Sequence, residues 1–145
     1  MFTGILRGLR ARAVAKLPLH LRNGSRGEDL AYHHLCGNGY VIVARNYRPR
    51  TGKGEIDLIG WDADRLAFIE VKTRESEQFG APERAVDQRK RGFLVRAARE
   101  YVRRARVDPA RMRFDVVSVV LGEAAPFIGL EKNAFSERSL YGRRR

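Results

Sequence analysis

The residues of this sequence best suited to chemistry are carboxylates and a lysine on two predicted strands. Asp57 follows Glu55 at a spacing of two residues, and Lys72 follows Glu70 at the same spacing. Alternate side chains of a strand project from one face of a sheet, so each pair should share a face. Apolar residues separate the members of each pair, as expected for strands that bury their other face.

A hairpin would bring the two pairs together. We predict a four-residue loop at 62–65, which pairs Trp61 with Leu66. Counting back from that pair places Asp57 directly across from Glu70. Opposed side chains in an antiparallel pair lie roughly 4.5–5.5 Å apart. Two carboxylates at that distance repel each other unless a cation lies between them.

Two arrangements could neutralise these carboxylates. In the first, Lys72 and other basic side chains form a purely structural ion network. In the second, Mg²⁺ binds there, because it takes oxygen ligands from one or two carboxylates and keeps several waters. Lys72 could then orient or activate a bound water while the metal polarises a phosphoryl group. The pattern of residues leaves both arrangements open.

Composition restricts the possible partners. The chain has 145 residues, and its 29 lysines and arginines exceed its 17 acidic residues to give a net charge of +12. Such an excess favours a polyanionic partner, with nucleic acid ahead of an anionic membrane surface. The single cysteine, Cys36, excludes an internal disulfide framework and Cys-x-x-Cys zinc sites, and we expect it to be buried.

The same composition bears on location. A chain with one cysteine fits a reducing cytoplasmic setting. No apolar run approaches the roughly 20 residues that a membrane-spanning helix requires, so stable insertion into a membrane is not expected.

The sequence divides into three parts. Residues 1–23 form a basic amphipathic extension, because the first acidic residue is Glu28. Residues 24–135 form the folded domain, and residues 136–145 form a basic tail. Ser25 and Glu28 match the S-x-x-E capping box, which predicts that the first helix of the domain begins with Ser25 as its N-cap.

Hydrophobic patterns predict the order helix, three strands, long helix, strand. The helices are expected at 25–36 and 82–105, the strands at 40–44, 55–61, 66–73 and 112–121, with a short edge strand within 126–135. On the long helix, the stripe expected to face the core contains Val86, Phe93, Ala97 and Tyr101, with Lys90 inside it. Asp115, on the last of the four strands, is expected to cap or pair structurally rather than bind a metal.

Several motifs carry a resemblance to a known family. They are Gly27-Glu28-x-x-Ala31, Gly39-Tyr40, residues 54–59, residues 68–74 and residues 113–117. In this order they resemble the YraN-like family of bacterial proteins, which are predicted nucleases similar to archaeal Holliday-junction resolvases. Asp57 with Glu70 and Lys72 also resembles the PD-(D/E)xK signature, with Ile56 in place of its proline.

The resemblance covers residues 24–135 and implies an α/β fold. The expected fold is a restriction-endonuclease-like αβββαβ core with a mixed central β-sheet flanked by helices. The implied activity is Mg²⁺-dependent cleavage of DNA, with Mn²⁺ as a plausible substitute.

Matched residue by residue, the resemblance implies a metal site formed by Asp57, Glu70 and Glu28. Lys72 matches the lysine that serves the attacking water. Glu28 also lies at helical spacing from Ala31, on the face expected to contact the sheet. Its alternative role is that of capping partner to Ser25. Lys90 is a further catalytic candidate that could reach the scissile phosphate or a site carboxylate.

Cations near the proposed site could hold phosphates without reading sequence. They are Arg48, Arg50, Lys53, Arg74, Arg84, Arg89 and Arg91. We therefore predict a metal-dependent DNA endonuclease that acts on branched or structured DNA, and by analogy with resolvases we expect a homodimer. The alternative is a non-catalytic nucleic-acid-binding protein with the same fold. A membrane-surface protein anchored by residues 1–21 would leave Asp57 and Glu70 unexplained.

Overall fold

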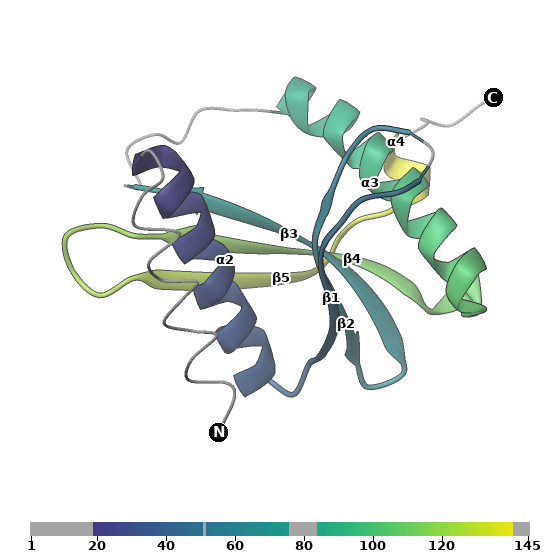
Figure 1. The fold of residues 1–145 in the computed structure, drawn as a ribbon, viewed down its shortest axis with the longest axis horizontal. Helices are drawn as coiled ribbons and strands as arrows, with labels where there is room; N and C mark the ends of the chain where they lie inside the picture. Colours follow the sequence, from purple (N-terminus) through teal and green to yellow (C-terminus); the bar gives the residue numbers. More distant parts are fainter. Residues whose placement is uncertain (1–18, 51, 76–83, 141–145) are drawn as a thin grey trace.

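The computed structural model describes residues 19–50, 52–75 and 84–140 (Figure 1). In chain order the elements are α2 (Leu19–Gly37), β1 (Val41–Tyr47), β2 (Ile56–Asp62), β3 (Arg65–Arg74), α3 (Arg84–Ala105), η2 (Pro109–Arg111), β4 (Met112–Val120), β5 (Phe127–Phe135) and α4 (Glu137–Leu140). The expected start of the long helix at residues 82 and 83, the side chain of Val86 and most of the basic extension lie outside the described residues. Within the described part of the chain, no helix is both long and apolar enough to cross a bilayer.

The five strands form one mixed sheet in the order β1-β2-β3-β4-β5. The pairs β1-β2, β2-β3 and β4-β5 are antiparallel, whereas β3 and β4 are parallel. A parallel pair requires a crossover connection, and α3 lies on the crossover between β3 and β4. The αβββαβ order and the mixed sheet confirm the predicted α/β fold, which is consistent with a restriction-endonuclease-like core.

Two hydrophobic clusters cover the sheet, one beneath each long helix. Phe68 packs with Leu94 and Ala98 of α3, whereas the next residue, Ile69, packs with Ala31 and Leu35 of α2. Neighbouring side chains on β3 therefore point to opposite faces, as strand geometry requires. The sheet is thus held between α2 and α3.

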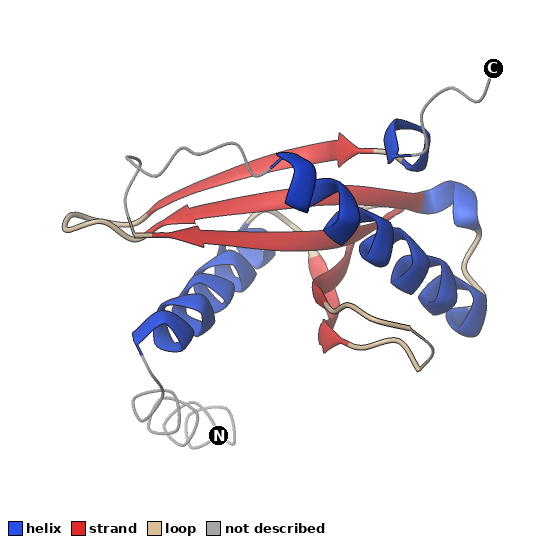
Figure 2. Ribbon diagram, turned by 90° about the horizontal axis from the view of Figure 1, so that it is seen from above, coloured by secondary structure: helices blue, strands red, loops and turns tan. Residues whose placement is uncertain are grey.

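The strands do not remain paired along their whole length. β1 and β2 run at a steep angle to the far ends of β3, β4 and β5 (Figures 1 and 2). The β2–β3 ladder extends only from Asp62 and Arg65 to Leu58 and Ile69, while β3 stays paired with β4 as far as Arg74. The sheet therefore forks where β2 leaves β3.

The structure corrects two local predictions. The predicted N-cap at Ser25 is wrong, because α2 begins at Leu19 and passes without a break through Ser25 and the predicted domain boundary at 23–24. A capping box requires a non-helical backbone at its first residue. The predicted four-residue loop at 62–65 is a two-residue turn, since Asp62 pairs with Arg65. Ala63 has a φ of 53° in that turn, a conformation that alanine does not signal in a sequence.

Three predictions about burial also change. Cys36, in the last turn of α2, is exposed rather than buried. The buried stripe of α3 is centred on Leu94 and Ala98, so that Phe93 and Tyr101 lie at its edges and are only half-buried.

The predicted tail at 136–145 is partly structured. It includes α4, where Glu137 forms an ion pair with Arg99 of α3. This contact ties the start of the predicted tail to the domain.

Candidate metal centre

The candidate site lies at the fork between β2 and β3. Asp57 and Glu70 are the residues immediately beyond the last pair of the ladder, Leu58 and Ile69. Instead of a backbone ladder bond, the Val71 N–H donates a hydrogen bond of 2.8 Å to Oδ2 of Asp57. The predicted register is therefore confirmed up to the fork, and the Asp57 carboxylate contacts β3 directly.

Three carboxylates from different elements meet at this fork. Glu28 comes from α2, Glu55 precedes β2, and Asp57 lies in β2. One oxygen of each lies within 4.8 Å of the others, and all three residues are partly buried. The resemblance implied a metal site of Glu28, Asp57 and Glu70, whereas the structure groups Glu28 and Asp57 with Glu55 and leaves Glu70 beside them. We call these three residues the carboxylate cluster.

Asn46, at the end of β1, links two members of the carboxylate cluster. With its amide nitrogen turned toward them, it donates to Oε1 of Glu55 at 2.8 Å and to Oε2 of Glu28 at 3.2 Å. Its backbone has a φ of 52°, in the left-handed region that asparagine tolerates better than most residues. Asn46 therefore positions Glu28 and Glu55 relative to each other.

The surroundings of Asp57 and Glu28 oppose the ionisation of these two carboxyl groups. Burial raises the pKa of Asp57 to about 6, and the negative charges of Glu70 and Glu55 add to this, against the Val71 N–H and Lys90. Burial also raises the pKa of Glu28, with Asp57 as the next cause. A divalent cation would remove this electrostatic strain. The donors are all carboxylate oxygens, which suit hard cations such as Mg²⁺ or Mn²⁺, so the residues present fit the predicted metal.

Glu70 lies beside the carboxylate cluster and has its own cationic partner. Its side chain is only 3 % exposed, and Oε1 lies 2.8 Å from Nζ of Lys90. Lys90 reaches it from the start of α3 with 54 % of its own side chain exposed. Lys90 therefore contacts a site carboxylate, one of the two roles suggested by the sequence, and leaves much of its side chain accessible.

Lys72 lies on the part of β3 beyond the fork, two residues after Glu70. It is half-buried and pairs in register with Ser118 of β4. The strand spacing that placed Glu70 and Lys72 on one face is kept, since β3 is regular through Arg74.

A glycine determines how closely α2 approaches this end of β3. A Cβ added to Gly27 would lie 2.9 Å from the Cβ of Thr73 and against its hydroxyl. Only glycine allows this approach, and Glu28 is the next residue along the helix. The contact between Gly27 and Thr73 therefore sets the position from which Glu28 reaches Asp57.

Gly27→Ala should move α2 away from β3 and weaken the site. We expect a loss of about 1–3 kcal/mol in stability, as for other overpacked positions, together with weaker metal binding because Glu28 is displaced. Gly37→Ala is the matched control: nothing lies within 4 Å of its added Cβ, so it should change little. Thermal melts with and without Mn²⁺ provide the measurement. Equal behaviour of the two variants would contradict the positioning role of Gly27.

The predicted phosphate-binding cations lie in three regions. Arg48, Arg50 and Lys53 are exposed on the connection between β1 and β2, which is fixed to α3 by bonds from the Arg50 N–H to Glu100. Arg74 is half-buried at the end of β3. Arg89 is exposed on α3, whereas the guanidinium of Arg91 lies over the ring of Phe135, 4.7 Å from its centroid. The Arg84 side chain lies outside the described residues.

Comparison with known proteins identifies the relatives of this chain. Residues 27–119 match the model of a family described as "Uncharacterised protein family UPF0102". This chain belongs to the UPF0102 family. The membership confirms the resemblance to the YraN-like family, and the matched residues include the carboxylate cluster, Asn46, Glu70, Lys72 and Lys90.

Three relatives illustrate the extent of the similarity within the UPF0102 family. A UPF0102 protein of Solibacter usitatus is 57% identical over 113 residues, covering 78% of this chain and 85% of the relative. One from Koribacter versatilis is 48% identical over 118 residues, covering 81% and 82%. One from Dehalococcoides mccartyi is 40% identical over 114 residues, covering 79% and 93%. The similarity therefore extends over nearly the whole folded core.

Two contributors to the site were not identified as such from the sequence. Glu55 had the spacing that puts it on the face of Asp57, but it was not taken as a metal ligand. Asn46 gave no signal in the sequence, because its role depends on a left-handed backbone at the end of β1. Both residues contact Glu28 or lie close to it only because α2 packs across the fork.

Proposed function

We propose that this chain is a metal-dependent DNA endonuclease that hydrolyses phosphodiester bonds, with branched or structured DNA as its substrate. The observation that carries the proposal is the carboxylate cluster of Glu28, Glu55 and Asp57 beside two lysines in a strongly basic protein. A purely structural role gives little reason to gather three partly buried carboxylates at one fork, because like charges at short range repel each other.

The residues have separate tasks in this proposal. Glu28, Glu55 and Asp57 would hold Mg²⁺ or Mn²⁺, and the bound ion would supply charge stabilisation at the phosphoryl group. Lys72 would orient the attacking water and move its proton. Glu70 keeps Lys90 at the mouth of the site through their ion pair, from which the lysine can contact a phosphate oxygen.

The exposed cations around the fork support a phosphate-bearing substrate. Arg48, Lys53 and Arg89 are exposed on elements next to the site, and we propose that they, together with Arg50, Arg74, Arg84 and Arg91, hold the DNA backbone. Such contacts position a substrate without reading its sequence. A homodimer is part of the same proposal, since resolvase-like nucleases cut paired strands. A cytoplasmic location is also part of it, because a chain with one cysteine fits a reducing compartment.

A cleavage assay on a panel of DNAs tests the proposal. Purified protein should cut at least one junction, flap or nicked duplex with Mg²⁺ or Mn²⁺ and none with EDTA. Lys72→Ala should abolish cleavage and retain metal binding, because Lys72 is not a member of the carboxylate cluster. If the parent protein binds every DNA in the panel without cutting it, the alternative of a non-catalytic nucleic-acid-binding protein is correct.

Binding of uncut DNA in EDTA should depend strongly on salt. A protein that neutralises 6–10 phosphates loses about 10³–10⁵ in affinity between 50 and 200 mM salt. We expect a steep dependence of this kind because the net charge is +12 and cations surround the fork. Fluorescence anisotropy of a labelled duplex at four salt concentrations gives the slope. A nearly flat response would remove the electrostatic support for a nucleic-acid substrate.

A further inference from the structure

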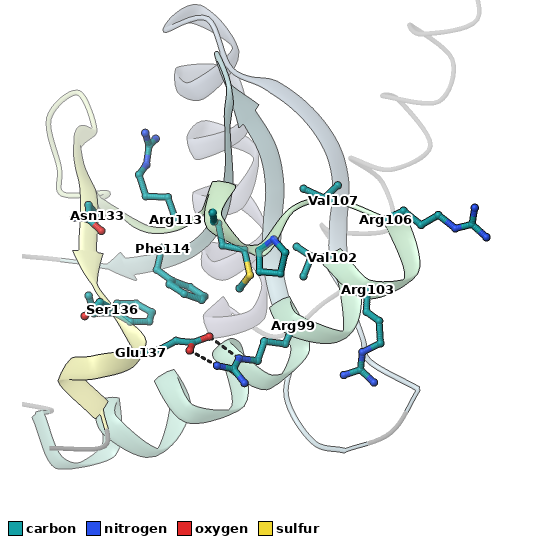
Figure 3. A pocket seen from close by; sticks show the side chains of 14 residues that line it. Arg99, Val102, Arg103, Arg106, Val107, Arg113, Phe114, Asn133, Ser136 and Glu137 are labelled. Atoms are coloured by element: carbon teal, nitrogen blue, oxygen red, sulfur yellow. Dashed lines mark hydrogen bonds and ion pairs between the residues drawn. The ribbon is translucent and has the colours of Figure 1, made fainter. Parts of the chain in front are cut away.

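A cavity at the C-terminal end of α3 lies apart from the carboxylate cluster. Its volume is about 840 Å³, and it is bounded by α3, η2, β4 and β5 (Figure 3). Cavities of roughly 300–1,000 Å³ are the usual size of sites that bind small ligands. The cavity is therefore large enough for a nucleotide, and the proposed cleavage chemistry gives it no role.

The wall of the cavity next to the core is apolar and aromatic. Phe114 and Phe135 both line it, with their rings stacked at a centroid distance of 5.0 Å and an interplanar angle of 19°. Met112 and Val107 line it as partly buried residues at its edge. Phe114 and Phe135 are only 5 % and 6 % exposed, and their ring faces contact each other, Phe68 and Arg91. A base in the cavity would therefore contact the edges of these rings and the apolar side chains beside them, as is usual for the apolar lining of a ligand site.

The mouth of the cavity carries cations that have no partner within the described part of the chain. Arg103 and Arg106 are exposed, and Figure 3 shows both extending away from the core. Two other arginines of the cavity are already engaged: Arg99 pairs with Glu137, and Arg113 pairs with Asp115. The unengaged pair at the mouth can therefore accept an anionic group such as a phosphate.

A row of arginines connects this mouth with the fork. Arg89, Arg96 and Arg103 follow each other at intervals of seven residues on α3, and all three are exposed. Such a row drifts by about 20° per interval around a helix. The guanidinium groups of Arg89 and Arg96 lie 5.9 and 5.5 Å from the ring centroid of Phe93, which is half-buried. The row thus runs along α3 from the residue before Lys90 to the mouth of the cavity.

We propose that the cavity binds one unstacked nucleotide of the DNA strand that is cleaved at the carboxylate cluster. The base would lie against the wall formed by Phe114 and Phe135, and Arg103 and Arg106 would hold the adjacent phosphate. This inference rests on the proposed nuclease function and deepens it, because it specifies a substrate with an unpaired nucleotide near the cleavage site. Flaps and junctions with unpaired nucleotides supply such a nucleotide, whereas uninterrupted duplexes do not.

The length of α3 fixes the spacing between the two sites. Thirteen residues separate Lys90 from Arg103, which is about 20 Å along the helix axis. Stacked nucleotides rise about 3.4 Å along one strand. The unpaired nucleotide should therefore lie roughly six stacked nucleotides from the scissile phosphate, or fewer where the strand is extended.

A pair of charge-matched double variants tests the site. Arg103→Glu with Arg106→Glu changes the mouth, whereas Arg104→Glu with Arg111→Glu changes two exposed arginines that do not line the cavity. Binding of a labelled single-stranded oligonucleotide in EDTA is followed by fluorescence anisotropy. The mouth variant should bind about tenfold more weakly than the control, corresponding to the loss of the contacts of one nucleotide. Equal weakening of both variants would overturn the proposal.

Photocrosslinking decides whether a base enters the cavity. An oligonucleotide containing 5-iodouracil should crosslink to the parent protein within residues 106–114 or at Phe135, and the mouth variant should lose these crosslinks. Crosslinks confined to residues 48–55 would overturn the proposal. A poly-glutamate peptide that competes as strongly as an oligonucleotide of equal charge would assign the cavity to an acidic protein partner instead.

The outcomes also separate this inference from the proposed function. Binding and crosslinking are measured in EDTA and do not depend on cleavage. If the parent cleaves branched DNA but neither variant differs from the other, the nuclease proposal holds and the nucleotide site is wrong. If the mouth variant loses binding and crosslinks but the parent cleaves nothing, the cavity binds nucleotides and the nuclease proposal is wrong.

Discussion

Asp57→Asn should raise the stability of the metal-free protein at pH 8 and abolish its cleavage of DNA. The asparagine oxygen can still accept the hydrogen bond from the Val71 N–H, so the local contact is kept while the buried charge is removed. Cleavage should vanish because the asparagine amide removes one of the three carboxylate charges that would hold the metal.

The pH dependence of this effect has a definite sign. The pKa of Asp57 rises from 3.8 to about 6 on folding, so the folded protein binds more protons than the unfolded chain between these values. Stability is therefore lost as pH rises through 6, and the loss is complete above it. Each pKa unit corresponds to about 1.4 kcal/mol, which gives an upper limit of about 3 kcal/mol for Asp57. The advantage of Asp57→Asn should shrink as pH falls toward 4.

Melting temperatures in EDTA at pH 8 and pH 4.5 measure this effect. We expect Asp57→Asn to melt several degrees above the parent at pH 8, with a smaller difference at pH 4.5. Asp64→Asn is the control, since it removes the same charge from an exposed turn residue and should change stability by less than about 0.5 kcal/mol. A lower melting temperature for Asp57→Asn at pH 8 would show that Asp57 stabilises the fold as part of an ion network.

Asp115→Ala should destabilise the protein strongly and leave its metal binding intact. Asp115 is fully buried and accepts two bonds of 2.8 Å from Arg113, one of 2.9 Å from the Tyr40 hydroxyl and one of 3.0 Å from the Asn133 N–H. The hydrogen bond from Arg113 to Asp115 is the largest cause that raises the pKa of Arg113. Burial raises the pKa of Tyr40, and the hydrogen bond from its hydroxyl to Asp115 is the next cause. This network confirms the structural role expected for Asp115 from the sequence.

The expected loss is about 3–5 kcal/mol, because removing one partner of a buried ion pair leaves the other uncompensated. Denaturant unfolding measures it. Asp62→Asn provides the comparison: Asp62 also binds Arg113, but it is less buried and should cost less. Below its melting temperature, Asp115→Ala should gain as much stability from Mn²⁺ as the parent does. If Asp115→Ala is as stable as the parent without metal but is not stabilised by Mn²⁺, Asp115 belongs to the metal site instead.

The register that places Asp57 near Glu70 could be predicted from the sequence, because it does not depend on the length predicted for the turn. A four-residue loop at 62–65 and the observed two-residue turn both pair Trp61 with Leu66, since Asp62 and Arg65 simply extend the ladder by one pair. Asp57 and Glu70 therefore lie at equivalent positions in either case. The alternation of charged and apolar residues on β3 was sufficient to predict that Glu70 and Lys72 share one face of the strand.

The membership of the carboxylate cluster could not be predicted, because it depends on long-range packing. β2 leaves β3 at Leu58, so Asp57 turns toward Glu28 and Glu55 while Glu70 pairs with Lys90. The capping box at Ser25 is a local pattern and was overridden by a helix that begins at Leu19. The close approach of Gly27 to Thr73 involves residues far apart in sequence, and no local pattern encodes it.

Direct titration of Mn²⁺ into the protein tests the central claim, that Glu28, Glu55 and Asp57 form a divalent metal site. Isothermal titration calorimetry at pH 7.5 should show saturable binding by the parent and none by Asp57→Asn, with Asp64→Asn behaving like the parent. Saturable binding that is unchanged in Asp57→Asn, or no binding by the parent, would contradict the claim.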